Sequence, residues 1–274
     1  MAVDFGKVFG PALKYPLRKD VYFLLFAFTL IFGLPIWFLT GYFLGDIGVV
    51  EGIVVAEIIG TFTSYMIYLA PVTIISWLIG IFLMAMYFDN SMWFYNGKGR
   101  SILESFEIAK GRFFSLMLTS IVIILIFAAC FGGAFLFIIF SFLAQQTNIL
   151  LVIGVIWFFI GSIIGAIVMF TIFLAPIFCV LEKTGPMDSI KKSWNLIMKN
   201  KLNTFIFLII YFVIFIVIWM ASSIPETVFI FVAGQYSVLS FQSLSFFILR
   251  TFFTAYLTLF AYSSYVNYYI TIKK

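Results

Sequence analysis

The longest run without a formal charge covers residues 113–181 and contains 69 residues. Soluble domains carry about 25% charged residues, so a run of this length excludes a soluble fold. It is long enough for two helices of about 20 residues, each crossing a hydrocarbon core of ~30 Å, with a turn between them. Gln145 and Gln146 lie near its middle and supply the polar turn. The run therefore predicts two transmembrane helices.

The rest of the chain follows the same pattern. Hydrophobic residues make up 64% of the sequence and charged residues only 10%, and the mean hydropathy is +1.19. We expect an all-α fold, a polytopic transmembrane helical bundle. Counting apolar runs as above predicts six spans, near residues 21–45, 60–88, 113–141, 149–180, 202–224 and 246–271.

The basic residues predict the topology. Fifteen of the sixteen Lys and Arg residues fall into four clusters that alternate with the apolar runs. Because basic residues are enriched in cytoplasmic connections, all four clusters are expected in the cytoplasm, with both termini, in a multi-pass protein of the cell membrane. Their spread over membrane-flanking segments favours the bilayer and its anionic headgroups as partner, and argues against nucleic acid. The clusters are Lys7/Lys14/Arg18/Lys19, Lys98/Arg100/Lys110/Arg112, Lys183/Lys191/Lys192/Lys199/Lys201 and Lys273/Lys274.

Two segments 88 residues apart resemble each other. Residues 97–106 and 185–194 match at a glycine, two serines, an isoleucine and an aromatic residue, and each begins an amphipathic helix that leads into a span. Ser101 and Glu104 form a capping-box pattern at the start of the first helix. The N-terminus offers a weaker third copy with an apolar stripe from Phe5 to Leu13, which Pro11 is expected to kink or restart.

These matches suggest a threefold internal repeat within a single membrane domain. Five matched positions also arise by chance in so biased a composition, so the repeat is a hypothesis. The prediction of the two amphipathic helices does not depend on it. The units would be residues 1–88, 89–181 and 182–274.

Each amphipathic helix is expected to lie at the cytoplasmic interface. One interpretation is a structural elbow that sets the angle of the next span; the other is a surface for a partner or for anionic lipid. The residues of that predicted lipid or partner surface are Lys98, Arg100, Lys110, Arg112, Lys191, Lys192, Trp194 and Lys199.

Residues 174–194 resemble a known family. A proline late in a span (Pro176), a glutamate at its end (Glu182) and a following helix with Ser193-Trp194 are similar to a broad set of prokaryotic polytopic membrane proteins. That set includes the membrane domain attached to some glycerophosphoryl diester phosphodiesterases. The resemblance implies a six-span bundle and, for most members, no assigned activity.

The composition argues against an enzyme. There is no histidine, which removes the commonest general base and metal ligand, so no cofactor or metal site is expected. The carboxylate candidates are Asp89, Glu104 and Glu107 with Lys110, but Glu107 and Lys110 at i,i+3 are more typical of a solvated ion pair. No glycine-rich loop leads from a strand into a helix to bind a nucleotide.

Two ionisable residues are candidates for a polar site within the membrane or at its interface, Arg250 and Glu57. Arg250 either reaches the outer headgroups, forms a buried pair with Glu57, or forms an anion site. Residues 228–247 are apolar but rich in Ser and Gln, and we expect them to form an outer-face helix or a re-entrant element beside that site.

The sequence also predicts how the spans pack and where they bend. Gly161 and Gly165 form a small-residue row that favours close helix packing, and Pro71 and Pro176 are expected to kink their spans.

Two functions are compatible with this pattern. The first is an integral membrane protein without catalysis that scaffolds or modulates a process at the cytoplasmic leaflet, with a membrane protein or a second copy as partner. The alternative is a transporter or channel for a lipid-like or small apolar solute, using Arg250 and Glu57.

Overall fold

The computed structural model describes residues 3–44, 55–143, 147–233 and 241–273. Within these residues the fold is helical and contains no strand. The elements in chain order are α1 (Phe5–Lys14), the 3₁₀ turn η1 (Tyr15–Leu17), α2 (Lys19–Leu44), α3 (Val55–Tyr95), α4 (Ile102–Leu143), α5 (Thr147–Ile172), α6 (Ala175–Leu181), α7 (Pro186–Lys199), α8 (Lys201–Ala233) and α9 (Phe241–Lys273).

Six stretches are long and apolar enough to cross a membrane. The predicted all-α polytopic bundle is therefore confirmed, and the chain is a multi-pass membrane protein. The six stretches are Lys19–Leu39, Ser64–Tyr95, Ile102–Gly133, Val152–Leu181, Lys201–Ala221 and Ser243–Lys273.

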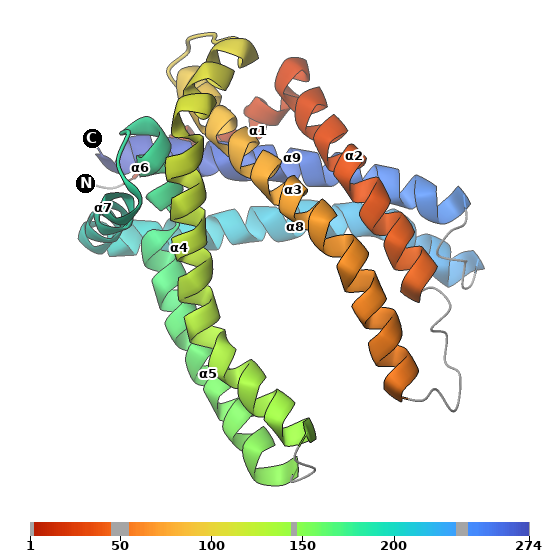
Figure 1. The fold of residues 1–274 in the computed structure, drawn as a ribbon. Coiled ribbons are helices and arrows are strands. Elements are labelled where there is room, and N and C mark those ends of the chain that lie inside the picture. The colour runs from red at the N-terminus through yellow and green to blue at the C-terminus, as the bar shows by residue number, and fades with distance from the viewer. Residues whose placement is uncertain (1–2, 45–54, 144–146, 234–240, 274) are drawn as a thin grey trace.

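The long helices form three hairpins, α2–α3, α4–α5 and α8–α9. Figure 1 shows that these hairpins diverge from one end of the molecule, where both chain ends, α6 and α7 lie. We call this the basic end, because α1, the α3–α4 turn, α7 and the end of α9 bring the four basic clusters there. Helix α9 is central, since it packs against α1, α2, α3 and α8.

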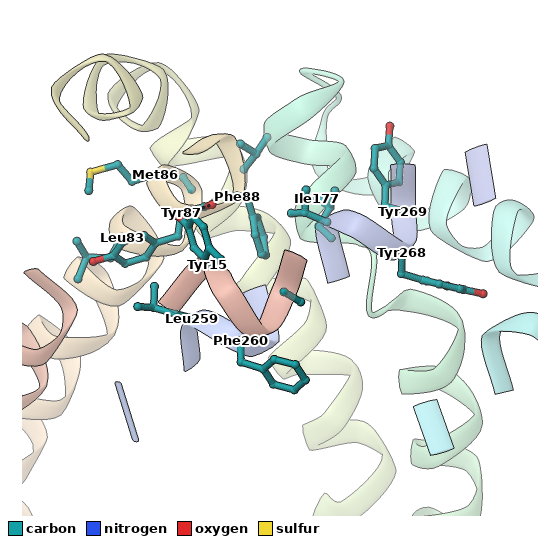
Figure 2. Packing of buried hydrophobic residues seen from close by; sticks show 14 of the residues in the cluster. Tyr15, Leu83, Met86, Tyr87, Phe88, Ile177, Leu259, Phe260, Tyr268 and Tyr269 are labelled. Carbon is teal, nitrogen blue, oxygen red and sulfur yellow. Dashed lines mark hydrogen bonds between the residues drawn. The ribbon is translucent and has the colours of Figure 1, made fainter. Parts of the chain in front are cut away.

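Most of the described hydrophobic core lies toward the basic end. Figure 2 shows Tyr15, Tyr87 and Phe88 beside Leu259 and Phe260 of α9, with Ile177 of α6 nearby. Phe207 of α8 stacks on Tyr268 at 4.1 Å between ring centroids and on Phe9 of α1 at 5.4 Å. Farther along the hairpins, large apolar side chains are exposed, as expected of surfaces that face lipid. Examples are Ile31, Phe38, Ile67, Leu125, Phe159, Ile163, Phe212 and Val217.

Helix starts and breaks follow local chemistry. The hydroxyl of Ser101 accepts a hydrogen bond from the Glu104 amide at 3.2 Å, which confirms the predicted cap of α4. Helix α5 ends at Ile172, and Pro176 lies in the first turn of α6, where its missing N–H costs no helical hydrogen bond. Helix α1 continues through Pro11 to Lys14, so the helix does not restart there. Helix α3 likewise continues through Pro71.

Glycines bring α4 and α5 into close contact. A Cβ atom on Gly161 would overlap the carbonyl oxygen of Cys130, and one on Gly165 would lie 3.1 Å from the ring of Phe131. The predicted small-residue row is therefore confirmed at these two positions, and it acts within the chain.

The expectation of a separate element at residues 228–247 is wrong for its two flanks. Residues 228–233 continue α8 and residues 241–247 begin α9, while 234–240 lie outside the described residues. A continued helix satisfies its backbone hydrogen bonds internally, whereas a re-entrant segment would need partners in the surrounding protein.

Candidate functional site: the basic end

The amphipathic helix α1 docks onto the bundle through its apolar stripe. Val8, Phe9 and Ala12 are buried, and the backbone oxygen of Val8 accepts a hydrogen bond from Asn267 Nδ2 of α9 at 2.9 Å. Tyr256 of α9 donates to the Leu13 carbonyl at 3.0 Å. Most of this stripe therefore faces protein and not the headgroup layer.

The second amphipathic segment is the first part of α4 and joins its span without a break. Ala109 is fully buried, and the ring of Phe106 packs edge-on against Phe82 of α3 at 4.8 Å. Both α1 and this segment thus support the structural elbow among the two interpretations.

Helix α7 also leaves part of its apolar surface uncovered, as the start of α4 does at Leu103 and Phe106, which are 79% and 45% exposed. Ser189, Ser193 and Ile197 are buried, and the Ser193 hydroxyl donates to the Thr171 carbonyl of α5 at 2.8 Å. Next to this buried face, Met187, Trp194 and Met198 are 58%, 42% and 43% exposed. Their spacing of seven and four residues places them in one line, which we call the α7 edge.

A first polar cluster ties α3 to the start of α4. Asp89 has a nearly buried carboxylate, which accepts hydrogen bonds from Arg100 Nη1 at 3.0 Å and from Ser105 Oγ at 2.9 Å. The Arg100 guanidinium also lies 5.1 Å from the ring centroid of Trp93 and 3.5 Å from the Glu104 carboxylate. Burial of a charge is tolerated here because both carboxylate oxygens have donors.

The N-terminal segment joins this cluster through Asn90. Its Oδ1 accepts hydrogen bonds from Arg18 Nη1 at 3.1 Å and from the Tyr15 hydroxyl at 3.3 Å, while its Nδ2 donates to the Arg100 carbonyl at 3.0 Å. Arg18 also pairs with Asp20 at 2.6 Å. The start of α2, the end of α3 and the start of α4 are therefore held in one hydrogen-bond network.

A second polar cluster is centred on Glu182, just after α6. Its carboxylate lies 2.6 Å from Lys192 Nζ of α7 and 2.8 Å from Lys273 Nζ of α9, and it accepts a hydrogen bond from the Tyr269 hydroxyl at 2.6 Å. Burial alone would raise the pKa of Glu182, but the hydrogen bonds from Lys192, Lys273 and Tyr269 outweigh it and lower the pKa to about 2. Glu182 thus fastens the loop before α7 to the end of α9.

The second cluster has the chemistry of a structural tie. A general base works best with a pKa near the operating pH, and Glu182 is held ionised far below it. Among the described residues no group of three His, Cys, Asp or Glu side chains is placed to hold a metal ion. The suggested ion pair of Glu107 with Lys110 does not form in the structure; Glu104 pairs with Arg100 instead.

The predicted surface residues fall into two groups. Arg100 and Lys192 belong to the polar clusters, and Lys98 lies 5.6 Å from the ring centroid of Trp93. The remaining cations form no ion pair with a described residue. They are Lys110, Arg112, Lys191 and Lys199, and all but the half-buried Arg112 are exposed like Trp194.

The second predicted site is not assembled by the described side chains. Arg250 is exposed in the first third of α9. Glu57 belongs to α3, but its side chain lies outside the described part of the structure, so the pairing of Arg250 with Glu57 stays a prediction.

Sequence reasoning missed several partners in the two clusters. It named Glu182 as a family feature and Asp89 as a carboxylate candidate, but not Asn90, Arg18 or Tyr269. One sequence signal could have indicated two of the ion pairs. Glu182 is followed 10 residues later by its partner Lys192, and Asp89 is followed 11 residues later by its partner Arg100.

Comparison with known proteins gives one match. A family model described as a domain of unknown function, DUF7847, matches residues 24–270. No curated protein and no solved structure matches the chain. The match carries no link to glycerophosphoryl diester phosphodiesterases, so that relationship stays a prediction. Since the match spans 247 of the 274 residues, the chain belongs to the DUF7847 family of uncharacterised function.

Proposed function

We propose that the protein is a scaffold without catalytic activity that binds and modulates a membrane protein partner at the cytoplasmic leaflet. The observation that carries this proposal is the α7 edge of Met187, Trp194 and Met198. It is apolar, exposed and fixed in place by Ser193 below it and by the Lys192–Glu182 pair beside it. Aromatic and Met side chains are enriched in protein interfaces.

The charges around this edge support the same proposal. Lys191 and Lys199 are exposed on α7 and pair with no described carboxylate. These unpaired cations beside the α7 edge favour a partner with an acidic surface. The anionic leaflet also attracts the cations, so the partner surface would lie close to the membrane. The polar clusters hold α7 and its neighbours in a fixed arrangement, which suits a surface that must present several side chains together.

The test is mass spectrometry of what co-purifies in native-lipid nanodiscs. We expect a stoichiometric protein companion with the wild type, and its loss from the variant that combines Lys191→Glu with Trp194→Ala. Lys110→Gln, an exposed cation on α4 away from this edge, is the matched control and should retain the companion. A companion that survives the α7 variant, or none with the wild type, would contradict the scaffold.

Transport of a lipid-like solute is a second candidate, and one observation favours it. An open apolar cavity of about 750 Å³ borders α5, α8 and α9 and is lined by Phe170, Phe173, Phe212, Tyr211 and Tyr265 among others. It opens to the outside of the bundle, since Phe205 and Phe212 in its wall are 56% and 60% exposed. If Arg250→Ala abolished uptake of such a solute while the α7 variant had no effect, transport would replace the scaffold as the better function.

A further inference from the structure

We propose that this cavity holds one acyl chain of an anionic glycerophospholipid, whose phosphate is bound by Lys201 at the basic end. The lipid is a bound structural partner of the chain. The inference goes beyond the proposed scaffold, because it requires neither a protein partner nor transport.

The lining of the cavity fits a hydrocarbon chain. Along α5 its wall is Ala166, Met169 and Phe170, at helical spacing on one face, and Phe173 follows in the turn after α5. Tyr265 of α9 completes it on one side. A volume of about 750 Å³ falls in the range of ~300–1,000 Å³ typical of ligand pockets.

Lys201 lies at the basic end of the wall that α8 contributes to the cavity. Phe205, Leu208, Ile209 and Phe212 line the cavity, and Lys201 lies one turn before Phe205 on the same face of α8, at the i,i+4 position. Helical side chains lean toward the helix N-terminus, so Lys201 extends beyond the apolar wall toward the headgroup level. The wall is therefore apolar where the acyl chain would lie and cationic where the phosphate would lie.

The length of this wall matches one leaflet. From Lys201 to Phe212 there are eleven residues, or about 16 Å of helix, and half of a hydrocarbon core is about 15 Å. The cavity residues of α5 with the turn after it, and those of α8, both run inward from the basic end, from Phe173 to Ala166 and from Phe205 to Phe212. A chain that entered beside Lys201 would thus follow α8 and pass the end of α5 close to the basic end, where the two helices diverge.

The local charge favours an anionic headgroup. Lys199 and Lys201 flank the junction of α7 and α8, and neither pairs with a described carboxylate. Lys201 also begins α8, whose positive dipole end therefore lies at the same place. A zwitterionic lipid would fit the apolar wall equally well and carries the same phosphate, but Lys199 and Lys201 would repel its cationic choline or ethanolamine group.

The experiment uses the full chain in nanodiscs of equal phosphatidylglycerol and phosphatidylcholine, followed by mild detergent extraction and native mass spectrometry. We expect the wild type to retain one phosphatidylglycerol. Ala166→Phe, which fills the cavity from α5, should lose the retained lipid. Lys201→Gln should retain a lipid with about fivefold less preference for phosphatidylglycerol, which corresponds to roughly 1 kcal/mol for one lysine near the surface.

Two matched variants control for general effects. Ala129→Phe places the same bulk on an exposed position of α4, and Lys110→Gln removes an exposed charge elsewhere at the basic end. Both should retain lipid as the wild type does, and every variant is first checked as a monodisperse species by gel filtration. The inference is overturned if the wild type retains no lipid or shows no headgroup preference, or if Ala166→Phe and Lys201→Gln behave like their controls. This experiment measures a retained lipid, whereas the scaffold test measures a protein companion. Either proposal can therefore fail while the other holds.

Discussion

The two ends of the hairpins are built on different principles. At the basic end, helices that are distant in the sequence share buried aromatic side chains and two polar clusters. Farther from that end the hairpins diverge from one another, although α4 and α5 stay packed at Gly161 and Gly165, and many large apolar side chains are exposed. Lipid tails are as apolar as Leu, so exposure there carries no hydrophobic cost.

This difference shows where the fold is specified. Close packing and paired charges distinguish one arrangement of helices from another, whereas lipid accepts many arrangements equally well. The crossing of the three hairpins is therefore determined mainly near α1, α6, α7 and the second half of α9. Substitutions in the two regions should have very different effects, and three experiments test that expectation.

The largest effect should come from truncating a core aromatic. Phe207→Ala removes a fully buried ring that stacks on Phe9 and Tyr268, so it leaves a cavity. We expect a loss of about 2–4 kcal/mol in the free energy of unfolding, measured by titration with sodium dodecyl sulfate in mixed micelles. The matched variant Phe159→Ala removes a ring that is 65% exposed on α5 and should cost less than about 0.5 kcal/mol. Similar losses for the two variants would contradict the difference between the basic end and the lipid-facing region.

A smaller effect is expected from the first polar cluster. Asp89→Asn removes the ion pair with Arg100 and leaves a half-buried guanidinium with fewer acceptors. The expected loss is about 2 kcal/mol in the same titration.

Asp20→Asn is the control for this variant. Asp20 pairs with Arg18 at 2.6 Å, but the carboxylate is half exposed, so we expect a loss of no more than about 0.5–1 kcal/mol. If Asp20→Asn were as costly as Asp89→Asn, burial would not be the reason that the first cluster matters.

The smallest effect concerns the pH dependence of stability at Glu182. Because its pKa is lowered to about 2 from 4.5, folding stabilises its ionised form. That contribution is complete above pH 4.5 and is lost as the pH falls through about 2. We expect Glu182→Gln to reduce stability at neutral pH by about 1 kcal/mol and to weaken the pH dependence between pH 4.5 and pH 2, measured by thermal unfolding.

Glu107→Gln serves as the reference for that series, since Glu107 is exposed and forms no ion pair with a described residue. Its pH profile should follow the wild type. A Glu182→Gln profile parallel to the wild type would show that the Lys192 and Lys273 contacts do not contribute to stability.

Much of the helical layout was predictable from the sequence because lipid enforces it. A chain in a bilayer must satisfy its backbone hydrogen bonds within helices, so an apolar run such as residues 149–180 predicts a span directly. Boundaries were less predictable: the span expected at 113–141 is the later part of α4, which begins at Ile102. No proline or capping residue separates the amphipathic start of α4 from its span, and Gly111 alone does not end a helix.

The candidate site was predictable only in part. Lys191, Lys199 and Trp194 could be placed on an exposed face of α7 from their spacing. The partners of Glu182 and Asn90 could not, because Tyr269 is 87 residues from Glu182 and Arg18 is 72 from Asn90. Such pairs depend on how the hairpins cross, which local sequence does not encode. The burial of Val8 and Phe9 against α9 escaped prediction for the same reason.

The central place of α9 has a consequence for biogenesis. It follows every other described helix in the chain, yet it packs on α1, α2, α3 and α8. Asn267 reaches back 259 residues to the Val8 carbonyl. The earlier hairpins therefore leave the ribosome and enter the bilayer before the helix that covers them exists. The contacts of α1, α2 and α3 with α9 can therefore form only after α9 has been inserted, whereas the α4–α5 pair can already be packed by then.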